Sequence, residues 1–157
     1  MQISKNFSIN WKRLAITIPV ASTANMLILF GLFMNPFSQN VIFSSSLNQS
    51  PKLVAVWTML EPVPQLGSLL PALLITPAIF GFLFAVLYDS IPGRTKIRKG
   101  VAYGAILWGT IAVFFELFAP FGLFGEPLHL LAYELFLWFV GLVSVSIIIS
   151  VLYQKKP

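Results

Sequence analysis

The chain has 157 residues, of which 57% are hydrophobic and 10% charged, with a mean hydropathy of +0.86 and a formal net charge of +5. A soluble domain of this size cannot bury so much apolar surface, so the composition predicts an integral membrane protein. Cysteine is absent, which excludes disulfides and thiolate metal sites, and the basic residues flank apolar segments, unlike those of a nucleic-acid-binding surface.

The first apolar segment, residues 14–34, contains no charged side chain. As a helix rising about 1.5 Å per residue, it covers the roughly 30 Å thickness of membrane hydrocarbon. A cleavable signal peptide is the competing interpretation, because residues 14–20 form an apolar core and the small residues 21–24 follow it. The apolar run continues to Met34, so we expect a transmembrane helix in which Asn25 seeks a neighbouring helix.

A long connection with several turn signals is expected over residues 35–66. Within it, residues 53–60 are apolar but too few to cross a membrane. We expect them to form a short helix at the membrane interface or against the mouth of the bundle. The run Glu-Pro-Val-Pro at residues 61–64 is expected to stop this helix.

Three further apolar segments, about residues 67–88, 100–119 and 128–152, are expected to cross the membrane. Pro120 is expected to end the third of these spans. The sequence therefore predicts an all-α fold with a single domain, residues 1–157. This domain is a polytopic membrane protein, a four-transmembrane-helix bundle with a short interfacial helix in the first outer loop.

The basic residues predict the orientation of these spans. The N-terminal arm, residues 89–99 and the C-terminal tail share one side and hold nine of the ten Lys and Arg residues, since Lys52 alone lies opposite. Cytoplasmic loops carry such an excess, so we expect a multi-pass protein of the cell membrane with its N-terminus and C-terminus in the cytoplasm. Tyr88, Tyr103 and Tyr153 are then expected to form an aromatic belt near the inner boundary.

Two glutamates, Glu116 and Glu134, fall inside predicted spans, and a carboxylate in hydrocarbon is a functional-site hypothesis by default. Antiparallel neighbouring helices bring the two to similar depth. A stripe of small residues precedes Glu116 in helical steps: Ala112, Gly109, Ala105 and Ala102. This stripe predicts that Glu116 faces a closely packed helix, and the GxxxG spacing of residues 100–104 also favours close packing.

Glu116, Glu134 and Asn25 form the candidate intramembrane polar site. Two adjacent carboxyl groups can share a proton, relay protons or hold a cation. The structural alternative is that each glutamate is protonated, or hydrogen-bonded to a backbone carbonyl, to Asn25 or to a tyrosine hydroxyl, and only fixes helix packing.

Glu126 and His129 have the Glu-x-x-His spacing of carboxylate metal bundles. Such bundles use two pairs of this kind plus further glutamates, so we predict no metal site and expect His129 to cap the turn. Four residues of one basic loop are candidates to bind lipid headgroups or a partner: Arg94, Lys96, Arg98 and Lys99. The alternative for these four residues is that they only set the topology.

Two stretches carry a resemblance to known proteins: GFLFAVLYDSIPGRTKIRKGVAYGAILWG at residues 81–109 and EPLHLLAYELFLWFVGL at residues 126–142. The features in common are a glycine-containing span, a Pro-Gly turn, and Gly, Tyr and Trp positions in the next helix. They fall at Gly81, Tyr88, Pro92, Gly93, Lys99, Gly100, Tyr103, Gly104 and Trp108. In these features the chain resembles a group of small four-helix prokaryotic membrane proteins of unknown function. The resemblance implies four helices and no particular activity.

The composition leaves few side chains for chemistry, so we expect no catalytic residue and no cofactor, and a non-catalytic role is favoured over an enzyme. The first hypothesis is a structural or accessory subunit that packs with itself or with a larger membrane complex, in contact with membrane lipids and not with nucleic acid. The alternative is a small carrier or a proton- or cation-coupled conduit that uses Glu116 and Glu134. A metal-dependent membrane enzyme is the third hypothesis.

Overall fold

The computed structural model describes residues 9–59 and 66–155, and every regular element in these two ranges is helical. Within these two ranges, three helices are long and apolar enough to cross a membrane: α1 (Trp11–Phe33), the continuous helix Lys96–Leu123 and α7 (Leu128–Leu152). The all-α prediction is confirmed. The predicted fourth span has the bounds of α7, and the predicted first span begins three residues after the start of α1.

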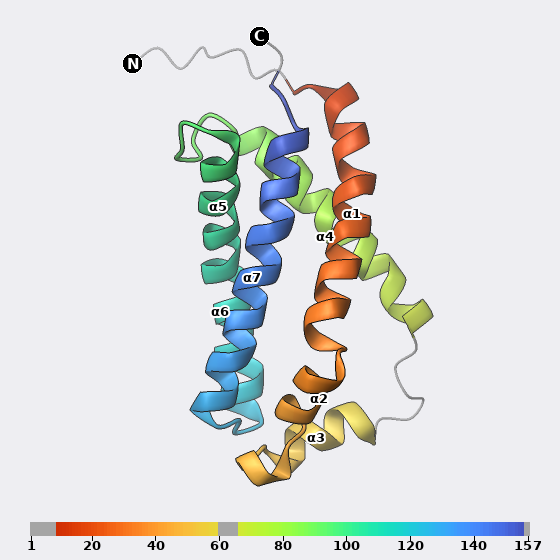
Figure 1. Cartoon of the computed structure of the whole chain (residues 1–157), viewed down its shortest axis with the longest axis vertical. Coiled ribbons are helices and arrows are strands. Elements are labelled where there is room, and N and C mark those ends of the chain that lie inside the picture. Colours follow the sequence, from red (N-terminus) through yellow and green to blue (C-terminus); the bar gives the residue numbers. More distant parts are fainter. Residues whose placement is uncertain (1–8, 60–65, 156–157) are drawn as a thin grey trace.

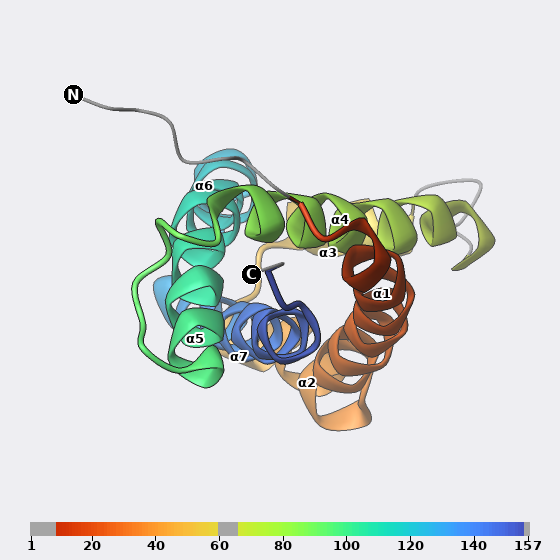
Figure 2. The same cartoon turned by 90° about the horizontal axis from the view of Figure 1, so that it is seen from above.

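α4 (Leu66–Leu87) corresponds to the predicted second span and contains Pro71 and Pro77. Its part Leu74–Leu87 is a shorter apolar helix. Figure 1 shows α7 between α1 and the helix that begins with α5 (Lys96–Leu107), while α4 runs obliquely behind them. Seen from above in Figure 2, these four helices surround a common interior. This interior is lined by apolar side chains from all four of them.

α5 packs directly against the backbone of α7 at two glycines. A Cβ atom added to Gly100 would lie 2.6 Å from the Cα of Ile147, and one added to Gly104 would lie 2.6 Å from the Cα of Val143. No side chain fits at that distance, so the two backbones approach this closely only because both positions are glycine. The GxxxG spacing therefore marks the contact with α7.

The helix that begins with α5 continues through two π-helical segments, η2 (Trp108–Ala112) and η3 (Leu117–Leu123), with α6 (Val113–Glu116) between them. The prediction that this span ends at Pro120 is wrong, because Pro120 lies inside η3. A proline disrupts an α-helix through its missing N–H and the clash of its ring with the preceding turn. The wider π turn, with its i→i+5 hydrogen bonds, accommodates the ring.

The first π segment also changes which residues face α7. The buried positions run from Gly104 and Leu107 to Ala112 and Glu116, with a five-residue step across η2. At about 100° per residue, an uninterrupted α-helix would turn Glu116 about 120° away from Gly104. The predicted stripe of small residues is therefore wrong at Gly109, which is exposed and has open space around its Cβ position.

The segments before α1, after α4 and after α7 meet at one end of the molecule (Figure 1). The Asn10 N–H donates to the Tyr153 hydroxyl at 3.2 Å, and the Asn10 side chain donates to the carbonyl of Gln154 at 3.0 Å. Lys155 forms an ion pair with Asp89 in the loop after α4. These three segments therefore share one end, as the predicted orientation requires.

Tyr103 and Tyr153 do not form the predicted aromatic belt. They are 2% and 0% exposed, and both rings pack against the buried ring of Phe84. The Tyr103 hydroxyl donates a 2.8 Å hydrogen bond to the carbonyl of Phe80. The two tyrosines turn inward because the interior gives their rings apolar contacts and gives this hydroxyl an acceptor.

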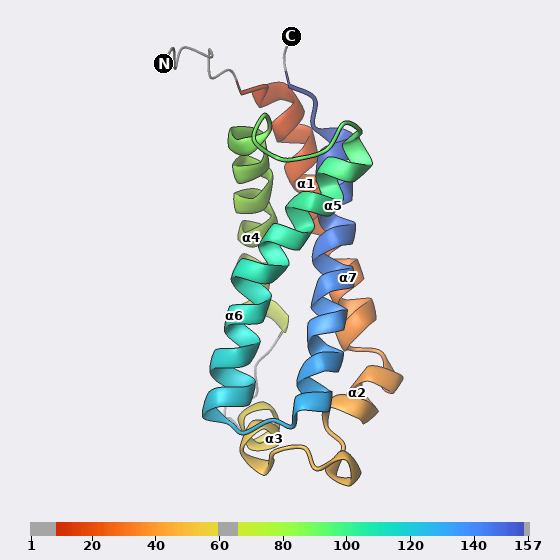
Figure 3. The same cartoon turned by 90° about the vertical axis from the view of Figure 1, so that its left-hand side faces the viewer.

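The opposite end carries the short helices α2 (Pro36–Ile42), η1 (Ser45–Leu47) and α3 (Pro51–Thr58). In Figure 3, α2 lies beside the first part of α7, and α3 lies below the turn that leads into α7. α3 overlaps the short helix predicted over residues 53–60, and its predicted stop at residues 61–64 lies outside the described residues. α2 was not predicted, although its N-cap and the proline at its first position are typical signals for the start of a helix.

Two glycine substitutions test the contact between α5 and α7. Gly104→Ala is expected to lower the free energy of unfolding by about 1–3 kcal/mol, because the added methyl group overpacks the two backbones. Gly109→Ala is the matched control, and it is expected to leave stability unchanged or slightly higher because its surroundings are open. Thermal unfolding in detergent micelles measures both variants, and equal losses of stability would contradict the proposed contact.

Candidate functional site

Three glutamates from three segments meet near the end of the bundle that carries α3. Glu116 is the last residue of α6, Glu126 lies in the turn between η3 and α7, and Glu134 lies in the second turn of α7. One carboxylate oxygen from each lies within 4.8 Å of the other two. The three residues are only 1%, 1% and 8% exposed, so three carboxyl groups share one buried space.

Two neutral side chains donate hydrogen bonds to this glutamate cluster. The Trp138 Nε1–H donates to Oε1 of Glu116 at 2.5 Å, and it comes from α7, one turn after Glu134. The Gln49 amide donates to Oε1 of Glu126 at 2.9 Å. Each donor holds one oxygen of its glutamate in place.

The other oxygens of Glu116 and Glu126 are the feature that defines the site. Oε2 of each is buried and has no hydrogen-bond partner among the residues that the structure describes. A buried carboxylate oxygen without a donor is costly, and three carboxylates at this separation repel one another strongly where water is excluded. The arrangement is therefore suited to accept positive charge, either as protons or as a cation.

The connection that precedes α3 covers the cluster from the end of the bundle. We call residues 47–50 of this connection the strap. Its hydrogen bonds to the turn before α7 and to the start of α7 are Gln49 to Glu126, the Ser50 hydroxyl to the carbonyl of Phe124, and the Leu47 carbonyl with Nε2 of His129 at 3.0 Å. Asn48, with a φ of +57°, makes the sharp bend that lets adjacent residues reach that turn. Gln49 and Ser50 are themselves buried there.

The structure brings together part of the predicted polar site. Glu116 and Glu134 are neighbours, as their expected similar depth requires. Asn25 is buried in α1, and within the described part of the chain no hydrogen bond joins it to the three glutamates. The Glu-x-x-His spacing pairs Glu126 with His129, but in the structure Glu126 lies with the other two glutamates. His129 is exposed and contacts the strap.

Sequence reasoning misses the two donors. Trp138 follows Glu134 by four residues, and side chains four residues apart lie on the same face of a helix. This spacing therefore indicates that Trp138 lies beside the glutamates. Gln49 lies in a long connection 77 residues before Glu126, and no local pattern points to it. Its role depends on the way the strap folds over the turn.

The four predicted headgroup residues divide into two kinds. Arg94, Lys96 and Arg98 are exposed, and the loop and helix start that hold them lie at the end where α1 begins and α7 ends. Lys99 is partly buried, and its Nζ donates to the carbonyls of Tyr88 at 2.6 Å and Ile91 at 2.8 Å. It also lies 4.7 Å from the centroid of the Tyr88 ring. Lys99 therefore holds the loop after α4 in place.

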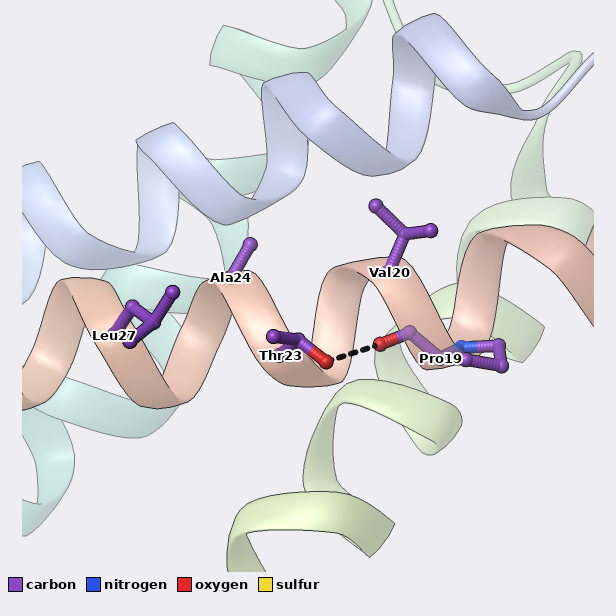
Figure 4. A pocket seen from close by; sticks show the side chains of 5 residues that line it. All are labelled: Pro19, Val20, Thr23, Ala24 and Leu27. Carbon is purple, nitrogen blue, oxygen red and sulfur yellow. Dashed lines mark hydrogen bonds between the residues drawn. The ribbon is translucent and has the colours of Figure 1, made fainter.

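An open apolar pocket of about 410 Å³ lies along α1 (Figure 4). Its lining residues are Pro19, Val20, Thr23, Ala24 and Leu27. The Thr23 hydroxyl already donates to the carbonyl of Pro19 at 3.1 Å. Ligand sites need polar groups that converge on the ligand, so this pocket is not the candidate site.

Comparison of the chain with protein-family models, with curated proteins and with solved structures finds no match. The chemistry of the site follows from the glutamates, their two donors and the strap.

Substitutions of two neighbouring basic residues test the structural role of Lys99. Lys99→Met is expected to lower the free energy of unfolding by about 1–3 kcal/mol, because two backbone carbonyls lose their donor. Arg98→Met, at an exposed position, is the control and is expected to change stability by about 0.5 kcal/mol or less. Thermal unfolding in detergent measures both, and a Lys99→Met variant as stable as the control would refute this role.

Proposed function

We propose that the protein is a small carrier or conduit in the membrane whose glutamate cluster binds protons or a cation. One observation supports this proposal above all others. Three buried carboxyl groups lie within 4.8 Å of one another, and Oε2 of Glu116 and Oε2 of Glu126 have no partner in the described part of the chain. Such a group of acids becomes stable when positive charge joins it.

In this proposal the chain crosses the cell membrane four times. α4 has 22 residues, and at about 1.5 Å per residue this length suffices for the roughly 30 Å of hydrocarbon. Large apolar side chains exposed on the outer helix surfaces, such as Phe114 and Phe136, support contact with lipid. α3 lies at the membrane interface, in accord with its exposed Trp57 and with the exposed Met59 that caps its C-terminal end.

Both termini lie in the cytoplasm in this proposal, because the end where α1 begins and α7 ends also carries Arg94, Lys96 and Arg98. These three exposed side chains are available there to acidic lipid headgroups. The glutamate cluster then lies at the extracytoplasmic end, beneath the strap. A proton or cation that enters from outside the cell therefore reaches the cluster before it reaches the rest of the bundle.

A second candidate function is the structural or accessory subunit. The observation that favours it is the open surface around Gly109, where nothing in the described residues beyond the adjacent residues and the nearby backbone of its own helix lies within 4 Å of the Cβ position. Ile106 and Ile111 are exposed beside it. A helix of a second copy or of another membrane protein can approach closely at such a surface.

Transport by reconstituted vesicles tests the first candidate. A proton or cation gradient is expected to drive a flux through the wild-type protein, and Glu116→Gln and Glu134→Gln are each expected to abolish it because they remove a negative charge from the cluster. Asp89→Asn, at the opposite end, is the matched control and is expected to retain the flux.

Unchanged flux in both glutamine variants refutes the conduit. A wild-type protein that conducts nothing but remains in a stable oligomer on gel filtration in mild detergent favours the accessory subunit instead.

The absence of cysteine allows a direct test of topology with single-cysteine variants. Asn40→Cys is expected to react with a membrane-impermeant thiol reagent in intact cells. Ser90→Cys and Gln154→Cys are expected to react only after the cells are opened, because both are exposed at the cytoplasmic end. Labelling of the positions 90 and 154 from opposite sides of the membrane would contradict the four-span topology.

A further inference from the structure

The glutamate cluster has the ligand chemistry of a site for a divalent metal ion. We infer that Glu116, Glu126 and Glu134 together bind one hard divalent cation of the size of Ca²⁺. This inference rests on the proposed function and narrows it, since that function leaves open whether protons or a cation join the carboxylates.

The available ligand atoms are all oxygens. The chain has no cysteine, and the single histidine is exposed with its Nε2 at the carbonyl of Leu47. Carboxylate sites without thiolate or imidazole ligands suit Mg²⁺, Ca²⁺ and Mn²⁺. The chemistry of the donors therefore selects a hard cation.

The separation of the oxygens favours the larger ions of this class. Three carboxylate oxygens, one from each glutamate, lie within 4.8 Å of one another. Ca²⁺ binds oxygens at about 2.3–2.6 Å, so two ligands on opposite sides of it lie up to about 5 Å apart. Mg²⁺ binds at about 2.0–2.1 Å and allows a separation of at most about 4.2 Å. Three oxygens evenly spaced around one ion lie at most about 4.0–4.5 Å apart for Ca²⁺ and about 3.5–3.6 Å apart for Mg²⁺, so an ion of the size of Ca²⁺ requires less movement of the glutamates.

Two ligand oxygens are oriented before any ion binds. Trp138 and Gln49 each hold Oε1 of one glutamate and so restrict the carboxyl group, while Oε2 of Glu116 and Oε2 of Glu126 accept no hydrogen bond from the described chain. Gln49 is itself held, because its amide also donates to the carbonyl of Ile42 and its oxygen accepts from the N–H of Ser50. Trp138 and Gln49 are therefore positioning residues of this site.

The charge of the cluster favours a divalent over a monovalent cation. Three ionised carboxylates carry a charge of −3, which a divalent ion reduces to −1 and a monovalent ion only to −2. A buried site with two uncompensated charges is much more costly than a site with one. Protons alone are the competing occupant, and the experiment distinguishes them from a metal ion.

The test uses the full chain in mild detergent, treated with a chelator and then titrated with Ca²⁺ or Mn²⁺ in a calorimeter. Wild type is expected to bind one ion per chain. Glu116→Gln, Glu126→Gln and Glu134→Gln are each expected to weaken binding by about tenfold or more, because each loses a charged ligand. Asp89→Asn, the control acid at the opposite end, is expected to bind as wild type does.

Terbium luminescence supplies a second readout that needs no variant of the ligands. Tb³⁺ replaces Ca²⁺ at oxygen sites and emits when a nearby indole absorbs light and transfers its energy. Tb³⁺ bound to wild type is expected to emit through Trp138, and added Ca²⁺ is expected to suppress the emission where an equal concentration of Na⁺ does not. Trp108→Phe is expected to keep the emission, because the indole nearest the cluster remains.

Folded wild-type protein that binds neither Ca²⁺, Mn²⁺ nor Tb³⁺ overturns the metal site and leaves protons as the occupant. Binding that survives unchanged in all three glutamine variants overturns it as well. Metal binding without any flux across vesicles overturns the conduit and supports the metal site. Proton flux without metal binding supports the conduit and overturns the metal site.

Discussion

The contact between the backbones of α5 and α7 at Gly100 and Gly104 is the constraint on which the rest of the structure depends. It fixes the two helices together at the end where α5 begins and α7 ends. Beyond this contact the helix that continues from α5 leans away from α7 towards the end that carries α3 (Figure 3). There the helices are joined through side chains, such as Trp138 and Glu116, instead of through their backbones. This widening makes room for three carboxyl groups.

The two π-helical segments position the acids within that space. η2 adds a residue to the turn, and this brings Glu116 onto the side of the helix that faces α7. η3 carries the chain past Pro120, whose carbonyl accepts a 2.9 Å hydrogen bond from the N–H of Glu126 and so folds the turn back over the helix end. π-helical insertions in α-helices are frequent at functional sites because they redirect side chains in this way. Both departures from regular geometry serve the same cluster.

The parts of this fold that sequence predicts are those fixed by local composition. The long apolar run after Pro127 defines α7, and the high cost of a carboxylate in hydrocarbon singles out Glu116 and Glu134. The stripe of small residues fails at Gly109 because it assumes 3.6 residues per turn throughout, whereas the π turn depends on packing between distant helices. Gln49 is missed for the same kind of reason, since only the folded strap brings it to Glu126.

The repulsion among the three glutamates is much larger than the stabilisation that the nearby helix dipole provides. The N-terminus of α7 lies beside Glu126 and favours a negative charge there by about 0.3–1 kcal/mol. Two carboxylates 4.8 Å apart repel by about 3.5 kcal/mol at an effective dielectric constant of about 20, so three such pairs repel by about 10 kcal/mol. The helix dipole therefore cannot hold three ionised glutamates together. Protons remove that repulsion one acid at a time, but a single divalent ion opposes it for all three and also gives the free Oε2 atoms a partner.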